Sequence, residues 1–158
     1  SRNQVNGGST RYIITHGQHE RIPSHARWFW NHHIIVFREN MEHLRCETIT
    51  LLRKLKADGK RVYGYGASTK GNTLLQYYGI TSELLPFITD RNPDKWGKLT
   101  VGSHIPIISE DSMRVCKPDY LFVLPWGFID TFKQREAEFL ERGGQFIVPL
   151  PKLDIIGG

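Results

Sequence analysis

The order of apolar and polar positions predicts one long helix, followed by alternating strands and helices. No Gly or Pro interrupts the stretch from Trp28 to Lys56, and its apolar residues from Phe37 to Leu55 recur every three or four positions. This spacing is typical of an amphipathic helix. Before this helix, β-branched and aromatic residues predict a strand over 9–15, and mostly polar residues predict a loop over 16–27.

After the long helix, short apolar runs alternate with short helical segments. The expected strands cover 61–65, 84–89, 104–108, 120–124 and 145–148, the expected helices cover 70–78, 109–115 and 131–142, and 90–102 is expected to be mostly loop. Strands and helices that alternate with short turns indicate βαβ crossovers. We therefore expect an α/β fold with a mostly parallel sheet and helices on both faces.

A glycine-rich turn stands between the first strand after the long helix and the helix that follows it. Gly64 and Gly66 let the backbone turn sharply and approach a ligand closely, and Ser68 and Thr69 can cap the helix. Lys70 then falls in the first helical turn, where its charge opposes the positive end of the helix dipole. An anion bound at this turn would offset that repulsion.

The turn matches neither standard phosphate-binding motif. A Walker A loop needs Gly-Lys followed by Ser or Thr, whereas the order here is Lys70-Gly71-Asn72. The dinucleotide motif needs a third glycine where this chain has Thr69. Asp90 stands near the position expected for an acid that binds ribose hydroxyls. The alternative interpretation is a tight turn with a solvated lysine and an aspartate that belongs to the loop.

Composition changes this picture only slightly. The 158 residues suit a single domain over 1–158, and 39% hydrophobic with 23% charged residues indicates a folded chain. A net charge of +5 suits an anionic ligand. The basic residues over 53–61 sit where a helix end favours them, so we do not expect nucleic-acid binding. No apolar run is long enough to span a membrane, and we expect a cytoplasmic protein.

Two groups of ring-bearing residues have competing interpretations. Six of the seven histidines fall in the first 43 residues, but their spacing is irregular and no cysteine pair accompanies them, so we expect no metal site. Trp126 follows the apolar strand expected over 120–124, at the carboxyl end of the sheet. Its ring either stacks on a base or closes the edge of the sheet.

Several segments together resemble the C-terminal domain of the S-adenosylmethionine-dependent sugar C-methyltransferases. The matching segments are YGYGASTKGNTLL at 63–75, DRNPDKWGK at 90–98, HIPI at 104–107, PDY at 118–120, LPW at 124–126, FIVPLP at 146–151, and NGGS at 6–9 with Arg11. Two loops differ from the family's usual pattern. Gly127 stands where a histidine is frequent, and Val101-Gly-Ser-His104 replaces a Pro-Gly-Thr-His loop.

This resemblance implies a Rossmann-like fold and a domain that helps to anchor a nucleotide-sugar substrate. Full-length family members also carry an N-terminal zinc-binding domain and a central domain that binds S-adenosylmethionine. The partners implied are therefore these two domains and the nucleotide-sugar, with S-adenosylmethionine and zinc bound outside this chain. The family's Tyr-x-Glu-His catalytic motif does not occur in this sequence. We therefore assign no catalytic residue and expect the chain alone to be inactive in methyl transfer.

The resemblance and the turn together give a set of expected substrate contacts. A pyrophosphate would accept hydrogen bonds from the backbone at 66–69 and a charge-assisted bond from Lys70, with Asp90 on the ribose. The full set is Gly64, Gly66, Ala67, Ser68, Thr69, Lys70, Asn72, Asp90 and Trp126. The alternative function is a stand-alone dinucleotide-binding or regulatory module that does no chemistry on sugars.

Overall fold

The computed structural model describes residues 2–3, 9–10 and 24–157, with side chains from His33 onward. The chain forms two compact units, Ser1–Glu42 and His43–Gly158. The first unit contains two short antiparallel strands, β1 (Arg2–Asn3) and β2 (Ser9–Thr10). Of the strand expected over 9–15, β2 confirms the start, and the rest lies outside the described residues. The single domain expected over 1–158 stays a prediction.

Helix α1 (Ser24–Ala57) is the predicted long helix. It begins four residues earlier than expected, so the loop predicted over 16–27 is wrong at its end; residues 16–23 lie outside the described part. Ser24-His-Ala-Arg contains no helix breaker, which explains why the helix extends through it. Only the end of the predicted stripe is buried, with Leu52 and Leu55 at 1% and 7% exposure, whereas Phe37 at its start is 66% exposed. This end of α1 is therefore anchored by apolar packing.

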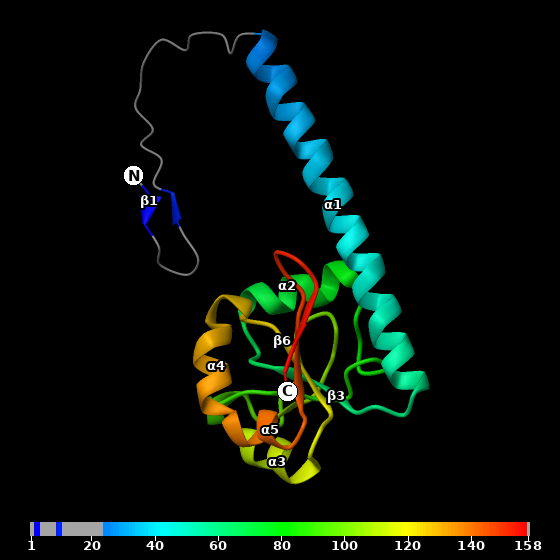
Figure 1. Cartoon of the computed structure of the whole chain (residues 1–158). Coiled ribbons are helices and arrows are strands. Elements are labelled where there is room, and N and C mark those ends of the chain that lie inside the picture. Colours follow the sequence, from blue (N-terminus) through cyan, green and yellow to red (C-terminus); the bar gives the residue numbers. More distant parts are fainter. Residues whose placement is uncertain (1, 4–8, 11–23, 158) are drawn as a thin grey trace. The chain divides into compact units, whose positions relative to one another are not determined.

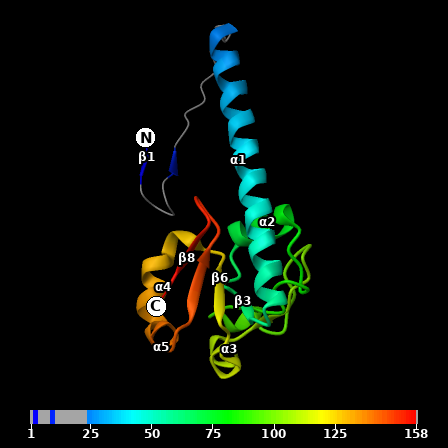
Figure 2. The same cartoon turned by 45° about the vertical axis from the view of Figure 1, so that its right-hand side comes forward.

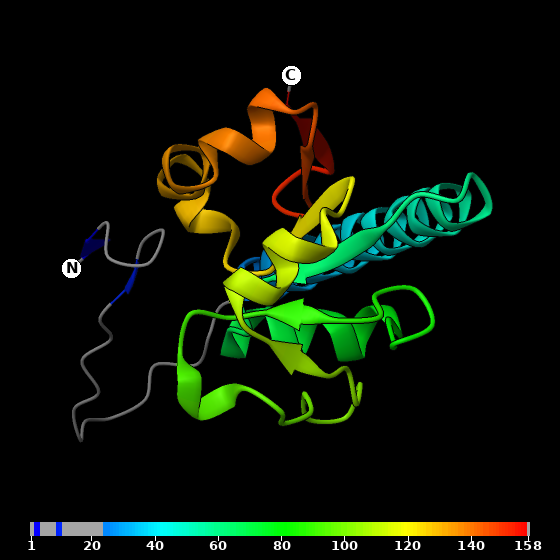
Figure 3. The same cartoon turned by 90° about the horizontal axis from the view of Figure 1, so that it is seen from below.

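A six-stranded sheet organises the second unit, in the order β5-β4-β3-β6-β7-β8. All neighbouring pairs are parallel except β7 and β8. This is the 3-2-1-4-5-6 order of a doubly wound dinucleotide-binding fold, so the Rossmann-like prediction is confirmed. The strands can be followed by colour in Figure 1, and Figure 3 shows β3, β4 and β5 side by side. Their bounds are β3 Val62–Tyr65, β4 Ile88–Thr89, β5 Ile107–Ile108, β6 Tyr120–Val123, β7 Gln145–Val148 and β8 Asp154–Ile156.

Helices cover both faces of the sheet, because alternate strand residues point to opposite sides. On one face Tyr65 and Phe146 form a buried cluster with Met113, Phe132 and Phe139, which come from three different helices. On the other face lie α2 and the second half of α1, and Figure 2 shows this division. The remaining helices are α2 Thr69–Tyr78, η2 Pro93–Lys95, α3 Glu110–Cys116, η3 Trp126–Phe128, α4 Ile129–Arg135 and α5 Ala137–Glu141.

Four further elements differ from the sequence-based prediction. The strand expected over 104–108 is reduced to β5, because His104 has a positive φ of 52° and only Ile107 and Ile108 pair with β4. The strand expected over 84–89 is reduced to β4, because Leu84 and Leu85 donate their amides to the carbonyl of Thr81 in a turn. The helix expected over 131–142 is two helices, which part at Glu136, where φ is −107° and ψ is 36°. Strand β8 was not predicted; it pairs antiparallel with β7 at the edge of the sheet.

Candidate functional site

Gly66 directly follows β3 and has a left-handed backbone conformation, which glycine adopts readily. Its φ is +81°, and a Cβ at this position would lie 2.6 Å from Cγ of Pro125. Its amide donates to the carbonyl of Thr89 at 2.7 Å. The chain therefore turns while pressed between the carboxyl ends of β4 and β6. Strand order reverses between β3 and β6, and open α/β sheets bind their ligands at such a point.

Helix α2 begins directly after this turn, as predicted. Ser68 is the N-cap, and its Oγ accepts from the amide of Gly71 at 3.0 Å. Gly71 packs against Leu124 so closely that a side chain there would collide with it. Thr69 and Lys70 are exposed in the first helical turn, which contains no acidic residue. The amides of Gly66, Ala67 and Ser68, which were expected to face a pyrophosphate, already donate within the chain to Thr89, Asp90 and Gly66. The feature of this end of α2 that favours an anion is therefore the positive end of the helix dipole.

Asp90 holds the turn in place through its carboxylate. Its Oδ2 accepts from the amide of Ala67 at 2.8 Å and from Nζ of Lys95 at 2.9 Å, and its Oδ1 accepts from the amide of Asn92 at 2.8 Å. The backbone carbonyl of Asp90 also accepts from the indole of Trp96 at 2.7 Å. A carboxylate has about four acceptor positions. Asp90 is thus mainly engaged within the chain, with room for one further donor.

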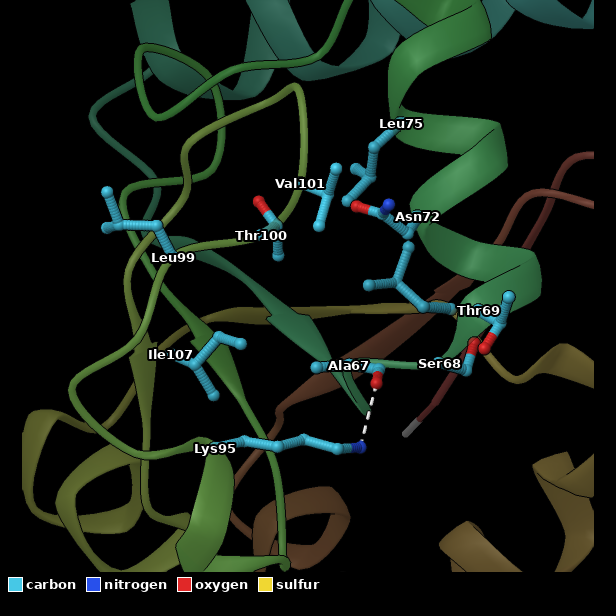
Figure 4. Close-up of a pocket in the computed structure, with 11 residues that line it drawn as sticks. Ala67, Ser68, Thr69, Asn72, Leu75, Lys95, Leu99, Thr100, Val101 and Ile107 are labelled. Carbon is cyan, nitrogen blue, oxygen red and sulfur yellow. Dashed lines mark hydrogen bonds between the residues drawn. The ribbon is translucent and has the colours of Figure 1, made fainter.

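Lys95 completes this arrangement, although it was not among the residues predicted from the sequence. Besides Asp90, its ammonium donates to the carbonyl of Ala67 at 2.9 Å, the bond drawn in Figure 4. Its side chain is 39% exposed. A lysine that donates both to Ala67 in the glycine-rich turn and to Asp90 presents a fixed positive charge beside the turn. The sequence did offer one indication, because Lys95 lies inside the 90–98 segment that resembles the family.

A cavity of about 300 Å³, the first cavity, opens between the start of α2 and the loop that joins β4 to β5. Its apolar lining residues are Ala67, Leu75, Leu99, Val101, Ile107 and Leu124, and its polar ones are Ser68, Thr69, Asn72, Lys95 and Thr100. Four of the predicted site residues therefore lie around one space, as Figure 4 shows. The wall formed by 99–101 was missed, because a loop carries no periodic pattern.

A second cavity of about 400 Å³ lies on the other side of the turn. It is lined by Gly66, Asp90, Arg91, Asn92, Glu110 and Arg135. Gly66 borders this cavity and its neighbour Ala67 borders the first, so the turn separates the two. The predicted contacts Gly66 and Asp90 belong here. The arginines were missed because they come from a loop and from a helix distant in sequence.

Behind the second cavity lies a buried network of charged side chains. The hydroxyl of Tyr65 donates to Glu136 at 2.8 Å, and Nε of Arg135 donates to that hydroxyl at 3.0 Å. Arg114 donates to Glu136 at 2.7 Å, and Arg135 pairs with Glu110 at 3.1 Å. Burial, and then the carboxylate of Glu136, raise the pKa of Tyr65 far above its ordinary value. The hydrogen bond to Glu136 raises the pKa of Arg114.

Three predicted contacts do not line either cavity. Gly64 lies inside β3, where an added Cβ would be 2.6 Å from Cγ1 of Ile88, so its role is close strand packing. Trp126 is half-buried and packs against the cluster that contains Tyr65 and Phe132. Lys70 is exposed on α2, beside the lining residue Thr69. The structure thus brings five of the nine around the turn and places Asp90 behind it.

Two other interpretations concern a membrane-spanning helix and a metal site. Within 24–157, no helix combines the length and the apolar character needed to cross a membrane. No group of three or more histidine, cysteine, aspartate or glutamate side chains stands together as a metal site in the part of the chain that the structure describes. Of the histidines in the first 43 residues, only His33 and His43 have described side chains.

Comparison with known proteins identifies the family of this chain. The chain is 41% identical over 120 residues to the C-methyltransferase NovU of Streptomyces niveus, an alignment that covers 76% of this chain and 29% of that protein. The chain thus spans less than a third of this relative. The model of the C-methyltransferase C-terminal domain matches residues 4–151. The chain therefore belongs to the C-methyltransferase C-terminal domain family.

Proposed function

We propose that this domain anchors the diphosphate of a nucleotide-linked keto-sugar for a C-methyltransferase that uses S-adenosylmethionine. The observation that carries the proposal is the capped start of α2 beside the first cavity, at the point where strand order reverses. A helix N-terminus with an adjacent cavity is a favourable place for a phosphate group. Ala67, Ser68 and Thr69 all border this cavity.

The charges around the turn support an anionic ligand. Lys70 lies in the first turn of α2, and the ammonium of Lys95 is 2.9 Å from the carbonyl of Ala67. The only carboxylate that contacts the backbone of the turn among the described residues is Asp90, which is already bonded to Lys95. A diphosphate would add two negative charges near the ammonium of Lys95 and at the helical turn that contains Lys70, with the dipole of α2 acting in the same sense.

Anchoring a substrate in this way serves catalysis elsewhere in the enzyme. Binding energy from the nucleotide holds the sugar's reactive carbon in place, so that the chemical step needs less ordering. In the proposed reaction a proton is removed next to the sugar's keto group, and that carbon then takes the methyl group. The methyl donor and the zinc ion are proposed to reside on other domains. This domain contributes binding and position.

Calorimetric titration of the 158-residue chain with thymidine diphosphate-glucose tests the proposal. We expect measurable binding that weakens several-fold in Lys70→Ala, because one cation at the diphosphate is lost. Lys60→Ala is the matched control: it removes the same charge from an exposed residue just before β3, at the opposite end of that strand. Tighter binding of NAD than of the nucleotide-sugar would instead favour a dinucleotide-binding module and refute the proposal.

A further inference from the structure

The two cavities at the turn differ sharply in the chemistry of their walls. Leu75, Leu99, Val101, Ile107 and Leu124 make the first cavity largely apolar. The second has no apolar side chain in its lining, which consists of the Gly66 backbone and five charged or amide side chains. A ligand that crosses the turn would therefore place an apolar part on one side and a polar part on the other.

The first cavity suits a flat heterocyclic ring. Small-molecule sites are typically apolar cavities of 300 Å³ or more, with a few polar groups that fix orientation. Here the polar groups in the lining include the hydroxyl of Thr69, the ammonium of Lys95 and the amide of Asn72, whereas the hydroxyl of Thr100 is already bonded to Ser103 and to the amide of Ile105. The faces of a nucleobase are apolar and its edges carry hydrogen-bonding groups, so the cavity matches both parts of such a ring.

The side-chain oxygen of Asn72 supplies an independent observation. This Oδ1 is buried and has no hydrogen-bond partner among the described residues. Buried polar atoms without partners are rare in folded proteins, and each calls for an explanation. Figure 4 shows the Asn72 amide extending from α2 toward Val101 across the cavity. A ligand with an N–H group on its ring edge would provide the missing donor once it displaces the atoms that cover this oxygen from solvent.

The second cavity suits a polyhydroxylated ring. Its lining alternates donors and acceptors: the guanidinium groups of Arg91 and Arg135, the carboxylates of Asp90 and Glu110, and the amide of Asn92. Arg135 is held rigidly, because it bonds to the hydroxyl of Tyr65 and to Glu110 and lies over the ring of Tyr65. Sugar hydroxyls both donate and accept, so a sugar can use either kind of group.

We infer that the substrate lies across the turn with its base in the first cavity and its sugar in the second. This orientation rests on the proposed function, since it needs a diphosphate at 66–69 to join the two parts. Gly66 faces the sugar side and Ala67 the base side. Leu99, Val101 and Asn72 then determine base recognition, and Arg91 contributes to sugar recognition.

Three probes separate the parts of the ligand: inorganic pyrophosphate, thymidine diphosphate and thymidine diphosphate-glucose. The double variant Leu99→Ser with Val101→Ser removes exposed apolar wall, at 54% and 73% exposure, without touching the core. We expect thymidine diphosphate to bind five-fold or more weakly, while pyrophosphate binding stays unchanged. The control is Val115→Ser with Ile155→Ser, two exposed apolar residues, at 82% and 42%, that line neither cavity.

Arg91→Ala tests the sugar side. Here thymidine diphosphate-glucose should bind about three-fold or more weakly, and thymidine diphosphate should bind as to the unaltered chain. Lys98→Ala is the control, because it removes an exposed cation from the same loop but lines neither cavity. If the double variant weakens binding of thymidine diphosphate-glucose but not of thymidine diphosphate, the inferred orientation is wrong and the proposed function stands. Failure of all three probes to bind the unaltered chain overturns the proposed function as well.

Discussion

Two charged clusters flank the carboxyl end of β3, and they are built differently. In the buried network, Tyr65, Glu136 and Arg114 bond to one another through side chains, and Glu136 is 3% exposed. At the turn, Asp90 bonds mostly to backbone amides, and its partner Lys95 is 39% exposed. The network joins α3 and α4 to the sheet, whereas the turn cluster shapes an open edge. One cluster stabilises the fold, and the other prepares a site.

Gly66→Ala should give the largest effect, because it strains the turn and crowds β6. Gly79→Ala is the matched control: both glycines have positive φ, at +81° and +69°, but only Gly66 has a neighbour where the new Cβ would lie. Left-handed backbone costs about 1–2 kcal/mol for a non-glycine residue, and crowding adds about 1–3 kcal/mol. Urea unfolding should show Gly66→Ala to be the more destabilised by at least about 1 kcal/mol. Equal losses would contradict the role of Pro125.

Arg114→Ala should come next, because it leaves the buried carboxylate of Glu136 without its closest cation. Breaking a buried pair costs about 3–5 kcal/mol. Arg114 is itself 40% exposed, so solvent screening reduces our expectation to about 2–3 kcal/mol in the free energy of unfolding. The exposed Arg53 on α1 is the control, with a change within about 0.5 kcal/mol on substitution by Ala. The affinity of the folded variant for nucleotide should be unchanged. A large loss of affinity would show that the buried network also takes part in binding.

Tyr65→Phe should show the pH dependence of the buried network. The pKa of Tyr65 is raised in the folded state. The contribution of Tyr65 to the free energy of unfolding is therefore complete below about pH 10, the pKa of an unfolded tyrosine. It is lost as the pH rises through the pKa of the folded state. At pH 7 the variant should lose about 1 kcal/mol with the hydrogen bond to Glu136. Unfolding measured from pH 8 to 11.5 should show this difference shrinking above pH 10. A constant difference would contradict the raised pKa.

Lys95→Met should affect stability least and binding more. It keeps most of the apolar stem but removes the ammonium that bonds to Asp90 and to the Ala67 carbonyl. Because Lys95 is 39% exposed, the loss of stability should stay below about 1 kcal/mol. Binding of thymidine diphosphate should weaken several-fold as the turn loses a cation. A stability loss as large as that of Arg114→Ala would show that the turn cluster is also structural.

The sequence predicted the elements well where local signals were strong. The glycine turn and the Ser68 cap of α2 both appear in the structure. These features depend on residues within one or two turns of each other, which the sequence displays directly. The break at Glu136 was not predictable in this way, because its carboxylate is bonded to Tyr65 and Arg114, residues distant along the chain.

In the candidate site, too, the residues near one another in sequence were predicted and several of those brought together by folding were missed. Ala67, Ser68, Thr69 and Asn72 were selected from the turn and do line the first cavity. Lys95 and Arg135 come close to the turn only when the chain folds. Lys95 is 28 positions from its partner Ala67 in the sequence, and Arg135 is 70 positions from its partner Tyr65. No local pattern encodes such distances. Asp90 was selected for a ligand, but its position makes it a support for the turn as well.

Mapping of ligand-induced amide shifts by nuclear magnetic resonance tests the central claim most directly. Thymidine diphosphate added to the ¹⁵N-labelled chain should shift the amides of 66–70 most, because the diphosphate would lie beside this stretch of backbone and change the electrostatic field around it. The polar cavity between α1 and the end of α2, lined by Arg45, Arg53 and Thr81, provides an internal comparison far along α2. The account predicts little change there. Largest shifts around Arg45 and Arg53, with 66–70 unmoved, would contradict it.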